Sequence, residues 1–131
     1  MGVFTDEERE FLGSQRLARL ATASPTGVPD VSPVGFGLQE DTIVSGGMDL
    51  TKTIRYRHLL ANPRATIVVD ELVSTDPWTP RGVKVRGAAT VEEHNGGLQI
   101  RIVPVVIWSW GVNPDAATHF ASIERRTVMP D

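Results

Sequence analysis

The chain has 131 residues, the length of one domain, and its 40% hydrophobic and 22% charged residues are typical of a globular protein. It contains no cysteine, which excludes disulfides, iron–sulfur clusters, zinc sites with thiolate ligands and cysteine nucleophiles. No apolar run approaches the roughly 18 residues of a transmembrane helix, and the acidic segment 1–8 lacks the apolar core of a signal peptide. We therefore expect a soluble, cytoplasmic protein with a single domain, residues 1–131, and no membrane partner.

Charge is distributed unevenly along the chain. A formal net charge of −3 argues against nucleic acid as a partner, because nucleic-acid-binding domains are usually basic. Residues 51–64, however, contain Lys52, Arg55, Arg57 and Arg64 and no acid. A local cationic patch on an acidic protein indicates a small anionic partner rather than a polyanion.

The first third of the chain predicts a helix followed by a β-hairpin. Thr5 and Glu8 have the spacing of a capping box, which predicts a helix from this point to about Gly13. Residues 16–24 and 28–38 predict two strands joined by a Pro/Gly turn, and the prolines and glycines of the second strand indicate an edge or a bulge. Its even positions place four apolar side chains on one face: Val28, Val34, Phe36 and Leu38.

The middle of the chain predicts a short strand and then a helix. A turn at 39–42 leads to a strand at 43–45, and residues 51–62 predict a helix that the pair Asn62-Pro63 terminates. The cationic patch therefore lies on a helix.

The second half of the chain predicts more strands. The patterns at 65–70, 83–92 and 100–110 are β, with a proline-pinned loop at 76–82 and a turn at 94–97. The last strand is apolar on both faces, which indicates burial on both sides or a subunit contact, and we expect Val103, Val105 and Ile107 to face a second subunit.

A short terminal helix is expected from Asn113 onward, because Asn113 and Pro114 suit the first positions of a helix. The total is about six mostly antiparallel strands, one internal helix and two terminal helices. Such an order favours a mainly β antiparallel barrel over a parallel α/β sheet.

The start of the central helix is the most informative feature for function. Lys52 is expected in its first turn, with Arg55 on the same face. Backbone N–H groups, hydroxyls and two cations that converge at a helix start favour a phosphate site. The alternative is a solvated basic helix whose arginines pair with nearby acids. The neighbouring residues of the predicted site are Gly46, Gly47, Thr51 and Thr53.

Three tryptophans form a second group of candidates. Trp108 and Trp110 alternate, so they are expected to share a face of the last strand. Packing in the core or against a subunit is the favoured role, and stacking on a flat ligand is the alternative. Trp78, in the proline-pinned loop, is a candidate cover for a planar ring.

No side-chain arrangement for acid–base or nucleophilic catalysis is apparent. The three histidines, His58, His94 and His119, lack metal-ligand spacing, and we expect no metal. The segment Gly35-Phe36-Gly37 is only a fragment of a dinucleotide-binding fingerprint. An enzyme with this sequence would take its chemistry from a cofactor.

The order of several segments resembles the pyridoxamine 5′-phosphate oxidase-like split β-barrel family. Residues 15–36 resemble its opening hairpin, and residues 53–70 are similar to its helix and following strand. Residues 76–87 and 100–111 resemble the branch of this family that uses the deazaflavin coenzyme F-420. The similarity extends from about Phe4 to Gly111.

The resemblance implies a split β-barrel that forms a homodimer, with the cofactor in a groove between subunits. It places the phosphate contacts at the helix start and the ring contacts on the second strand, where backbone groups contribute as much as side chains. The loop at 76–82 is expected beside the cofactor. The implied cofactor-binding residues are Ser32, Val34, Gly35, Phe36, Met48, Lys52, Thr53, Arg55, Trp78 and Arg81.

Two departures from the family pattern concern the substrate and the acidic tail of the cofactor. The connection 93–98 is short, and residues 105–107 lack a basic residue that relatives carry. Arg81 is the expected contact to the tail, because its proline-pinned loop would hold it over the groove, and pairing of Arg81 with Asp76 or a neighbouring acid is the alternative.

Three functions fit these observations. The first is an oxidoreductase in which reduced coenzyme F-420 delivers a hydride to a small organic acceptor, without an assigned catalytic acid or base. The second is an FMN-binding oxidase or reductase with the same fold. The third is a non-catalytic protein that carries the cofactor or binds haem, and the scattered histidines argue against haem.

Overall fold

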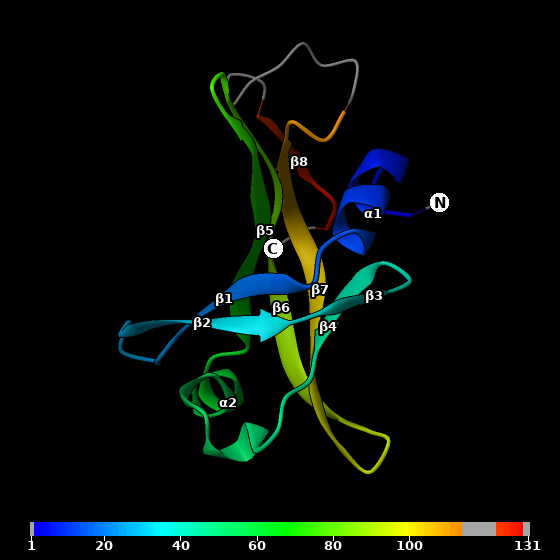
Figure 1. The fold of residues 1–131 in the computed structure, drawn as a ribbon. Coiled ribbons are helices and arrows are strands. Elements are labelled where there is room, and N and C mark those ends of the chain that lie inside the picture. The colour runs from blue at the N-terminus through cyan, green and yellow to red at the C-terminus, as the bar shows by residue number, and fades with distance from the viewer. Residues whose placement is uncertain (1, 114–122, 130–131) are drawn as a thin grey trace.

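The structure, a computed structural model, describes residues 2–113 and 123–129. These residues form one antiparallel sheet of eight strands, two α-helices and one 3-10 turn (Figure 1). The helical elements are α1 (Asp6–Gly13), η1 (Leu50–Lys52) and α2 (Ile54–Ala61). The strands are β1 (Leu17–Ala23), β2 (Pro29–Gly35), β3 (Gly37–Gln39), β4 (Thr42–Ser45), β5 (Arg64–Thr75), β6 (Trp78–His94), β7 (Gly97–Trp110) and β8 (Glu124–Thr127).

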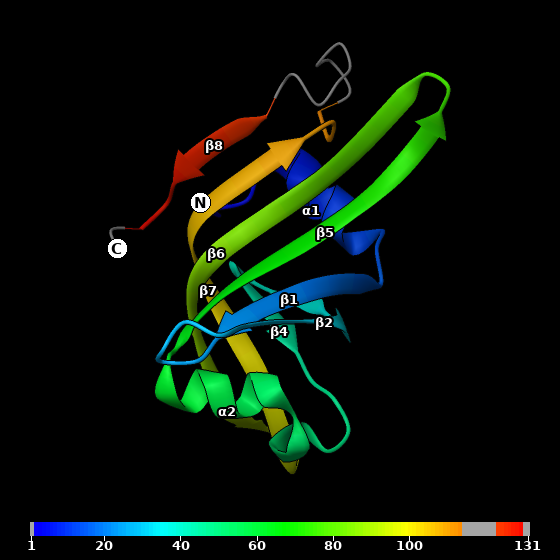
Figure 2. The ribbon, with the colours of Figure 1, turned by 90° about the vertical axis from the view of Figure 1, so that its left-hand side faces the viewer.

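The sheet has the order β2-β1-β5-β6-β7-β4-β3, and β8 pairs with the upper part of β7. The chain passes directly from β2 to β3 at Phe36, so the two ends of this order are joined in sequence and the sheet curves around a core. Strands β1, β5 and β6 lie in front in Figure 2, with α1 behind them. The expected mainly β, antiparallel barrel is confirmed.

The first helix begins and ends where the sequence predicts. The hydroxyl of Thr5 accepts the N–H of Glu8 at 3.1 Å, and the carboxylate of Glu8 accepts the N–H of Thr5 at 2.9 Å. This reciprocal capping box fixes the first turn, and Phe11 and Leu12 on the inner face are buried in the core.

The predicted hairpin of β1 and β2 is also confirmed, with Ala23 facing Pro29 next to the turn. Strand β2 is an edge of the sheet, as its prolines indicated. Val34 is buried, and Phe36 and Leu38 pack against the core, but Val28 is 59% exposed. Val28 precedes the first residue of β2 and belongs to the turn, so its expected place on the apolar face is wrong.

Strands β5 and β6 are longer than their patterns predicted, and they form an arm that extends beyond the barrel (Figures 1 and 2). The expected loop at 76–82 is wrong. Only Asp76 and Pro77 form the turn, and the ladder already pairs Thr75 with Trp78. Pro80 did not prevent pairing of β5 with β6. It lies opposite Leu72, next to a register shift between Leu72 and Ser74 that makes the ladder irregular at this point.

A bulge in β7 changes which of its residues face the core. Arg86 pairs with Val106 and Gly87 with Pro104, so Val105 is the extra residue. A Cβ at position 87 would lie 1.9 Å from the carbonyl oxygen of Val103, so the strands approach this closely only at a glycine. The bulge puts Val103 and Ile107 on opposite faces.

The expectation that Val103, Val105 and Ile107 face a second subunit together is therefore wrong. Ile107 is 0% exposed within the single chain and belongs to its core. Strand β8, which the sequence did not predict, covers the edge of β7 at this level. The expected terminal helix after Asn113 falls on residues outside the described ranges.

Within residues 2–113 and 123–129, no helix is long and apolar enough to cross a membrane. The cytoplasmic location stays a prediction.

Candidate functional site

Helix α2 begins at Ile54, three residues after the predicted start at residue 51. Thr53 is the N-cap: its hydroxyl donates to the carbonyl oxygen of Leu50 at 2.6 Å and accepts the N–H of Tyr56 at 3.2 Å. Lys52 belongs to the preceding turn η1, so its expected place in the first turn of the helix is wrong. A threonine hydroxyl caps a helix better than a lysine side chain does, and this sets the boundary at Thr53.

Arg55 lies in the first turn of α2 and is half-buried. Its Nε is buried and makes no hydrogen bond with any described residue. The guanidinium reaches back toward the glycines before the helix, since a Cβ at Gly47 would lie 3.0 Å from Nη2 of Arg55. A buried guanidinium N–H without a partner is costly, and an anion at this position would satisfy it.

The neighbouring cations are not neutralised by acids. Lys52, Arg55 and Arg57 form no ion pair with the part of the chain that the structure describes. The alternative of a basic helix whose arginines pair with nearby acids is thus not what these residues show. Met48, in the connection before η1, is 93% exposed. Together these features leave a positively charged, accessible surface at the start of α2.

The end of β2 lies beside this surface. The buried hydroxyl of Ser45, at the end of β4, donates to the carbonyl oxygen of Gly35 at 2.7 Å and holds the two strand ends together. The chain leaves β4 through Gly46 and Gly47 toward η1. The structure therefore brings Gly35 next to the segment that leads to Arg55.

The remaining candidates on β2 differ in exposure. The side chain of Val34 is 5% exposed and points into the core, so only its backbone faces the surroundings. Ser32 is half-buried, and its hydroxyl donates to Asp30 at 3.4 Å. Phe36 packs against the core at the join between β2 and β3.

Trp78 and Arg81 are not brought to this site within one chain. The turn between β5 and β6, which precedes Trp78, lies at the opposite end of the molecule from α2 in both views (Figures 1 and 2). Trp78 is 58% exposed. Arg81 pairs with Glu71 at 2.7 Å and stands 5.0 Å from the ring centre of Phe11. Pairing with a neighbouring acid, the alternative for Arg81, is what the structure has.

Trp108 and Trp110 share the outer face of β7, as their alternation predicted. Three cations surround the Trp108 ring: Lys84 at 4.3 Å, Arg86 at 5.3 Å and Arg125 at 5.6 Å from its centre. Sequence reasoning did not single out these cations. The alternation of Lys84 and Arg86 in β6 was the available signal, because residues two apart share a face of a strand.

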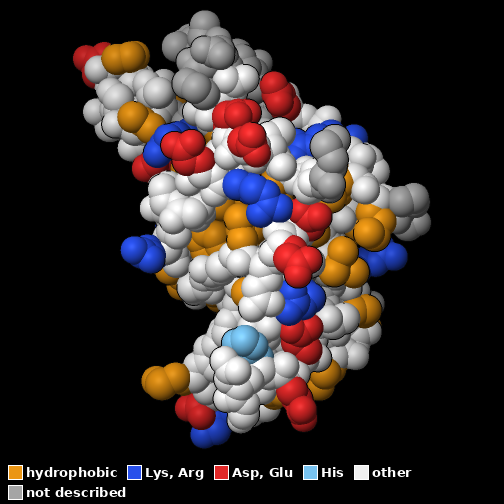
Figure 3. Space-filling model, turned by 90° about the vertical axis from the view of Figure 1, so that its right-hand side faces the viewer, with side chains coloured by type: hydrophobic (Ala, Val, Ile, Leu, Met, Phe, Trp, Pro, Cys, Tyr) orange, Lys and Arg blue, Asp and Glu red, His pale blue; other side chains and the backbone are white. Residues whose placement is uncertain are grey.

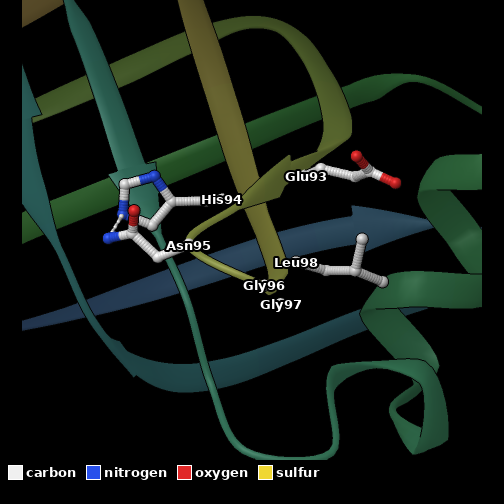
Figure 4. A pocket seen from close by; sticks show the side chains of 6 residues that line it. All are labelled: Glu93, His94, Asn95, Gly96, Gly97 and Leu98. Carbon is white, nitrogen blue, oxygen red and sulfur yellow. Dashed lines mark hydrogen bonds between the residues drawn. The ribbon is translucent and has the colours of Figure 1, made fainter.

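A pocket of about 420 Å³ lies at the turn between β6 and β7 and does not include any of the expected site residues. It is lined by residues 93–98 of this one hairpin (Figure 4). His94 and Asn95 lie together on one side of the hairpin, with Nε2 of His94 3.1 Å from Nδ2 of Asn95, and Leu98 points toward the green helix α2. A groove within a single exposed turn does not bury enough of a ligand to bind it firmly.

Residues 4–100 match the family described as pyridoxamine 5′-phosphate oxidase. The chain belongs to this family. The expected resemblance to the family is thus confirmed, whereas the resemblance to its deazaflavin branch stays a prediction. The matched segment includes the start of α2, strand β2 and the β5–β6 arm.

A curated relative from Streptomyces rimosus is a 5a,11a-dehydrotetracycline/5a,11a-dehydrooxytetracycline reductase. It is 33% identical over 125 residues, which cover 88% of each chain. The fold is similar to that of a heme-binding protein from Mycobacterium smegmatis, with a TM-score of 0.72 and 18% identity over 95% of this chain and 59% of that one. It is also similar to a FAD-binding protein from the same organism, with a TM-score of 0.65 and 18% identity over 84% of this chain and 97% of that one. The split-barrel fold is confirmed.

Proposed function

We propose that this protein is an oxidoreductase that uses reduced deazaflavin coenzyme F-420 to transfer a hydride to a small organic acceptor. Membership of the family and a reductase relative at 33% identity support oxidoreductase activity. The segments around Pro77 and Arg101, which resemble the deazaflavin branch, support the choice of cofactor. By analogy with that relative, the acceptor is a dehydro compound.

The observation that carries the proposal of a phosphate-bearing cofactor is the buried Nε of Arg55, which has no partner among the described residues. The residues at the start of α2 fit a phosphate group: Lys52 and Arg55 supply charge, and the first turn of the helix supplies backbone N–H groups. Thr53 holds the first turn in place through its cap. Both FMN and coenzyme F-420 carry a phosphate, so this site serves either cofactor.

The edge of β2 would orient the ring. Because β2 pairs only with β1 along its length, half of its backbone N–H and C=O groups are directed away from the ladder. The pyrimidine part of a flavin or deazaflavin presents complementary donors and acceptors. Backbone groups of Ser32, Val34, Gly35 and Phe36 would contact it, which agrees with the burial of the Val34 side chain.

When bound, reduced coenzyme F-420 supplies the hydride. The residues of this chain bind the phosphate, orient the ring and exclude water from it, and the proton that completes reduction comes from solvent. We assign no side chain as catalytic acid or base. Positioning is the contribution of the protein.

We further propose that the active form is a homodimer in which a second copy completes the site. The β5–β6 arm presents three exposed apolar side chains at its end, Leu72, Val73 and Trp78, far from α2 of the same chain. Exposed apolar side chains on a projecting arm favour a protein contact. In a two-fold dimer the Trp78 end of one copy would cover the cofactor at the α2 of the other.

The experiment that tests the cofactor is a titration of the purified protein with coenzyme F-420 and with FMN. We expect coenzyme F-420 to change its fluorescence on binding and its reduced form to be oxidised when a dehydro acceptor such as dehydrotetracycline is added. An FMN enzyme would instead purify yellow and bind FMN more tightly than coenzyme F-420. A carrier would bind cofactor without oxidising it in the presence of any acceptor.

An FMN-dependent enzyme is the second candidate. The FAD-binding structure with this fold and the oxidase name of the family favour it. A haem carrier has less support. Among the described histidines, His58 contacts the hydroxyl of buried Thr22 at 2.9 Å, and His94 lies at an exposed turn.

A further inference from the structure

A second pocket lies on the outer face of the sheet and shares no lining residue with the site at the start of α2. Its volume is about 660 Å³, within the range of small-molecule sites. Strands β1, β5, β6 and β7, the end of α2 and Met129 line it. Much of the lining consists of small apolar side chains, among them Ala21, Ala88 and Val105.

Two arginines stand at this pocket on neighbouring strands. Arg64 faces Ala88 and Thr66 faces Arg86 in the β5–β6 ladder, so Arg64 and Arg86 are diagonal neighbours on one face. Neither guanidinium group forms an ion pair or a hydrogen bond within residues 2–113 and 123–129. Like charges on diagonal neighbours of one sheet face repel each other, and a bound anion would offset this repulsion.

The surroundings of these arginines add positive charge. Lys84 and Arg125 lie next to Arg86 around the Trp108 ring. Asp70, on the same face of β5, forms an ion pair with Arg19, with 3.9 Å between the charged atoms. None of the described residues that line the pocket is acidic. On the side of the molecule that carries α1, by contrast, acidic and basic side chains are interspersed (Figure 3).

We infer that this pocket binds an organic anion with a flat apolar body, such as an aromatic carboxylate or sulfonate. The arginines would hold the anionic group, and the alanines, Val105 and Met129 would contact the apolar body. A small inorganic anion would leave the apolar lining uncovered, and a neutral aromatic would leave both arginines without a counter-ion. The inference goes beyond the proposed function, because it rests on residues that the cofactor proposal does not use.

Two fluorescent probes test the inference in the full chain without any cofactor. Anilinonaphthalene sulfonate has the anionic group, and phenylnaphthylamine has the same apolar body without it. We expect the wild-type protein to bind the sulfonate about tenfold more tightly than the neutral probe, as one charge-assisted hydrogen bond allows. Equal affinities for the two probes would overturn the inference.

Variants then locate the binding. Arg64→Gln and Arg86→Gln should each weaken sulfonate binding about tenfold and leave binding of the neutral probe within about twofold. Arg57→Gln, which removes an exposed arginine of α2 outside the pocket, is the matched control and should change neither. A similar loss in Arg57→Gln, or no loss in the other two variants, would show that the sulfonate binds elsewhere and overturn the inference.

A filled pocket gives a second, charge-independent test. Ala88 is an exposed lining residue of β6, so Ala88→Phe should weaken both probes while the thermal unfolding midpoint stays close to that of the wild type. Unchanged binding of both probes in this variant would place them outside the pocket and overturn the inference.

Arg55→Ala separates the two proposals: it should lose cofactor affinity yet bind the sulfonate as the wild type does.

Discussion

Arg126 in β8 and Glu8 in α1 form a salt bridge between parts of the chain that lie 118 residues apart. Nη1 of Arg126 donates to Oε2 of Glu8 at 2.8 Å, and Nη2 also donates to the carbonyl oxygen of Val3. Glu8 is only 1% exposed, so this pair holds the C-terminal strand to the first helix from inside the fold. A buried carboxylate depends on such partners, because burial without them is very costly.

The first prediction concerns the loss of this pair. Arg126→Met leaves the Glu8 carboxylate buried without its main partner and should lower the free energy of unfolding by about 3 kcal/mol. This value is at the low end for buried pairs, because the Arg126 side chain is 31% exposed. Urea denaturation measures this. The control is Arg9→Gln, which breaks the more exposed pair with Asp41 and should cost at most about 1 kcal/mol. Equal losses in the two variants would contradict the buried role of Arg126.

The second prediction is the pH dependence that Glu8 confers. Burial alone would raise the pKa of Glu8, but hydrogen bonds from Arg126, the N–H of Thr5 and Ser109 outweigh burial and hold its pKa below the ordinary value of 4.5. A lowered folded pKa means that the stabilisation is complete above the unfolded pKa and is lost as the pH falls through the folded pKa. Free energies of unfolding measured from about pH 6 to about pH 3 should therefore decrease, and decrease less in Glu8→Gln.

Glu92 contributes to the same acid dependence and has to be separated from Glu8. Hydrogen bonds from Arg101 and Gln99 lower the pKa of Glu92 to about 2. The difference between the wild type and Glu8→Gln at each pH removes this contribution, because Glu92 is present in both. A difference that does not vary with pH would show that Glu8 titrates normally in the folded protein.

Local patterns predicted those elements whose side-chain alternation is regular. The capping box of Thr5 and Glu8 set the start of α1, and the turn before Pro29 set the β1–β2 hairpin. Alternation failed in β7, because the extra residue Val105 exchanges the two faces of the strand. The bulge depends on the close approach of Gly87 in β6 to the backbone of β7. The sequence pattern of β7 alone gives no information about this contact.

The candidate site was also predictable only in part, because local sequence features indicate its charge but not its contacts with other strands. An acid-free segment with glycines before it indicated an anion site, and Arg55 with its buried Nε agrees with that prediction. The position of Lys52 was wrong because the capping hydroxyl of Thr53 decides where the helix begins. The pairing of Arg81 with Glu71 depends on the register between β5 and β6, which no local pattern specifies.

The third prediction concerns the phosphate site. Arg55→Ala should weaken cofactor binding by about 1.5–3 kcal/mol, the size of a hydrogen bond to a charged group. Arg57→Ala removes an equal charge from the exposed side of the same helix and should have a much smaller effect, which salt screens. Isothermal or fluorescence titration with coenzyme F-420 measures both. Equal affinities for Arg55→Ala and the wild type would place the phosphate elsewhere.

The fourth prediction concerns assembly. Sedimentation should show about twice the chain mass of 14.3 kDa at micromolar concentration. If each site combines Arg55 of one copy with Trp78 of the other, Arg55→Ala and Trp78→Ala should each lower cofactor binding. Refolding an equal mixture of the two variants should then restore about a quarter of the wild-type sites, because half of the dimers are mixed and each has one intact site. No recovery in the mixture, or a monomer in sedimentation, would rule out the shared site.

The last prediction concerns Arg81, whose contact with the acidic tail of the cofactor, expected from the sequence, competes with its pairing with Glu71. Nε and Nη2 of Arg81 both donate to Oε2 of Glu71, at 2.9 and 2.7 Å, and the two residues face each other in the ladder. Arg81→Glu puts two carboxylates opposite each other and should lower the free energy of unfolding by about 1 kcal/mol, a small effect because both side chains are about one third exposed. Adding Glu71→Arg should restore most of this loss. Because Arg81 is paired with Glu71, Arg81→Glu should change the affinity for coenzyme F-420 and the affinity for a tail-free analogue by the same factor. A larger, salt-sensitive loss of affinity for the long-tailed cofactor, without a change in the free energy of unfolding, would show that Arg81 contacts the tail.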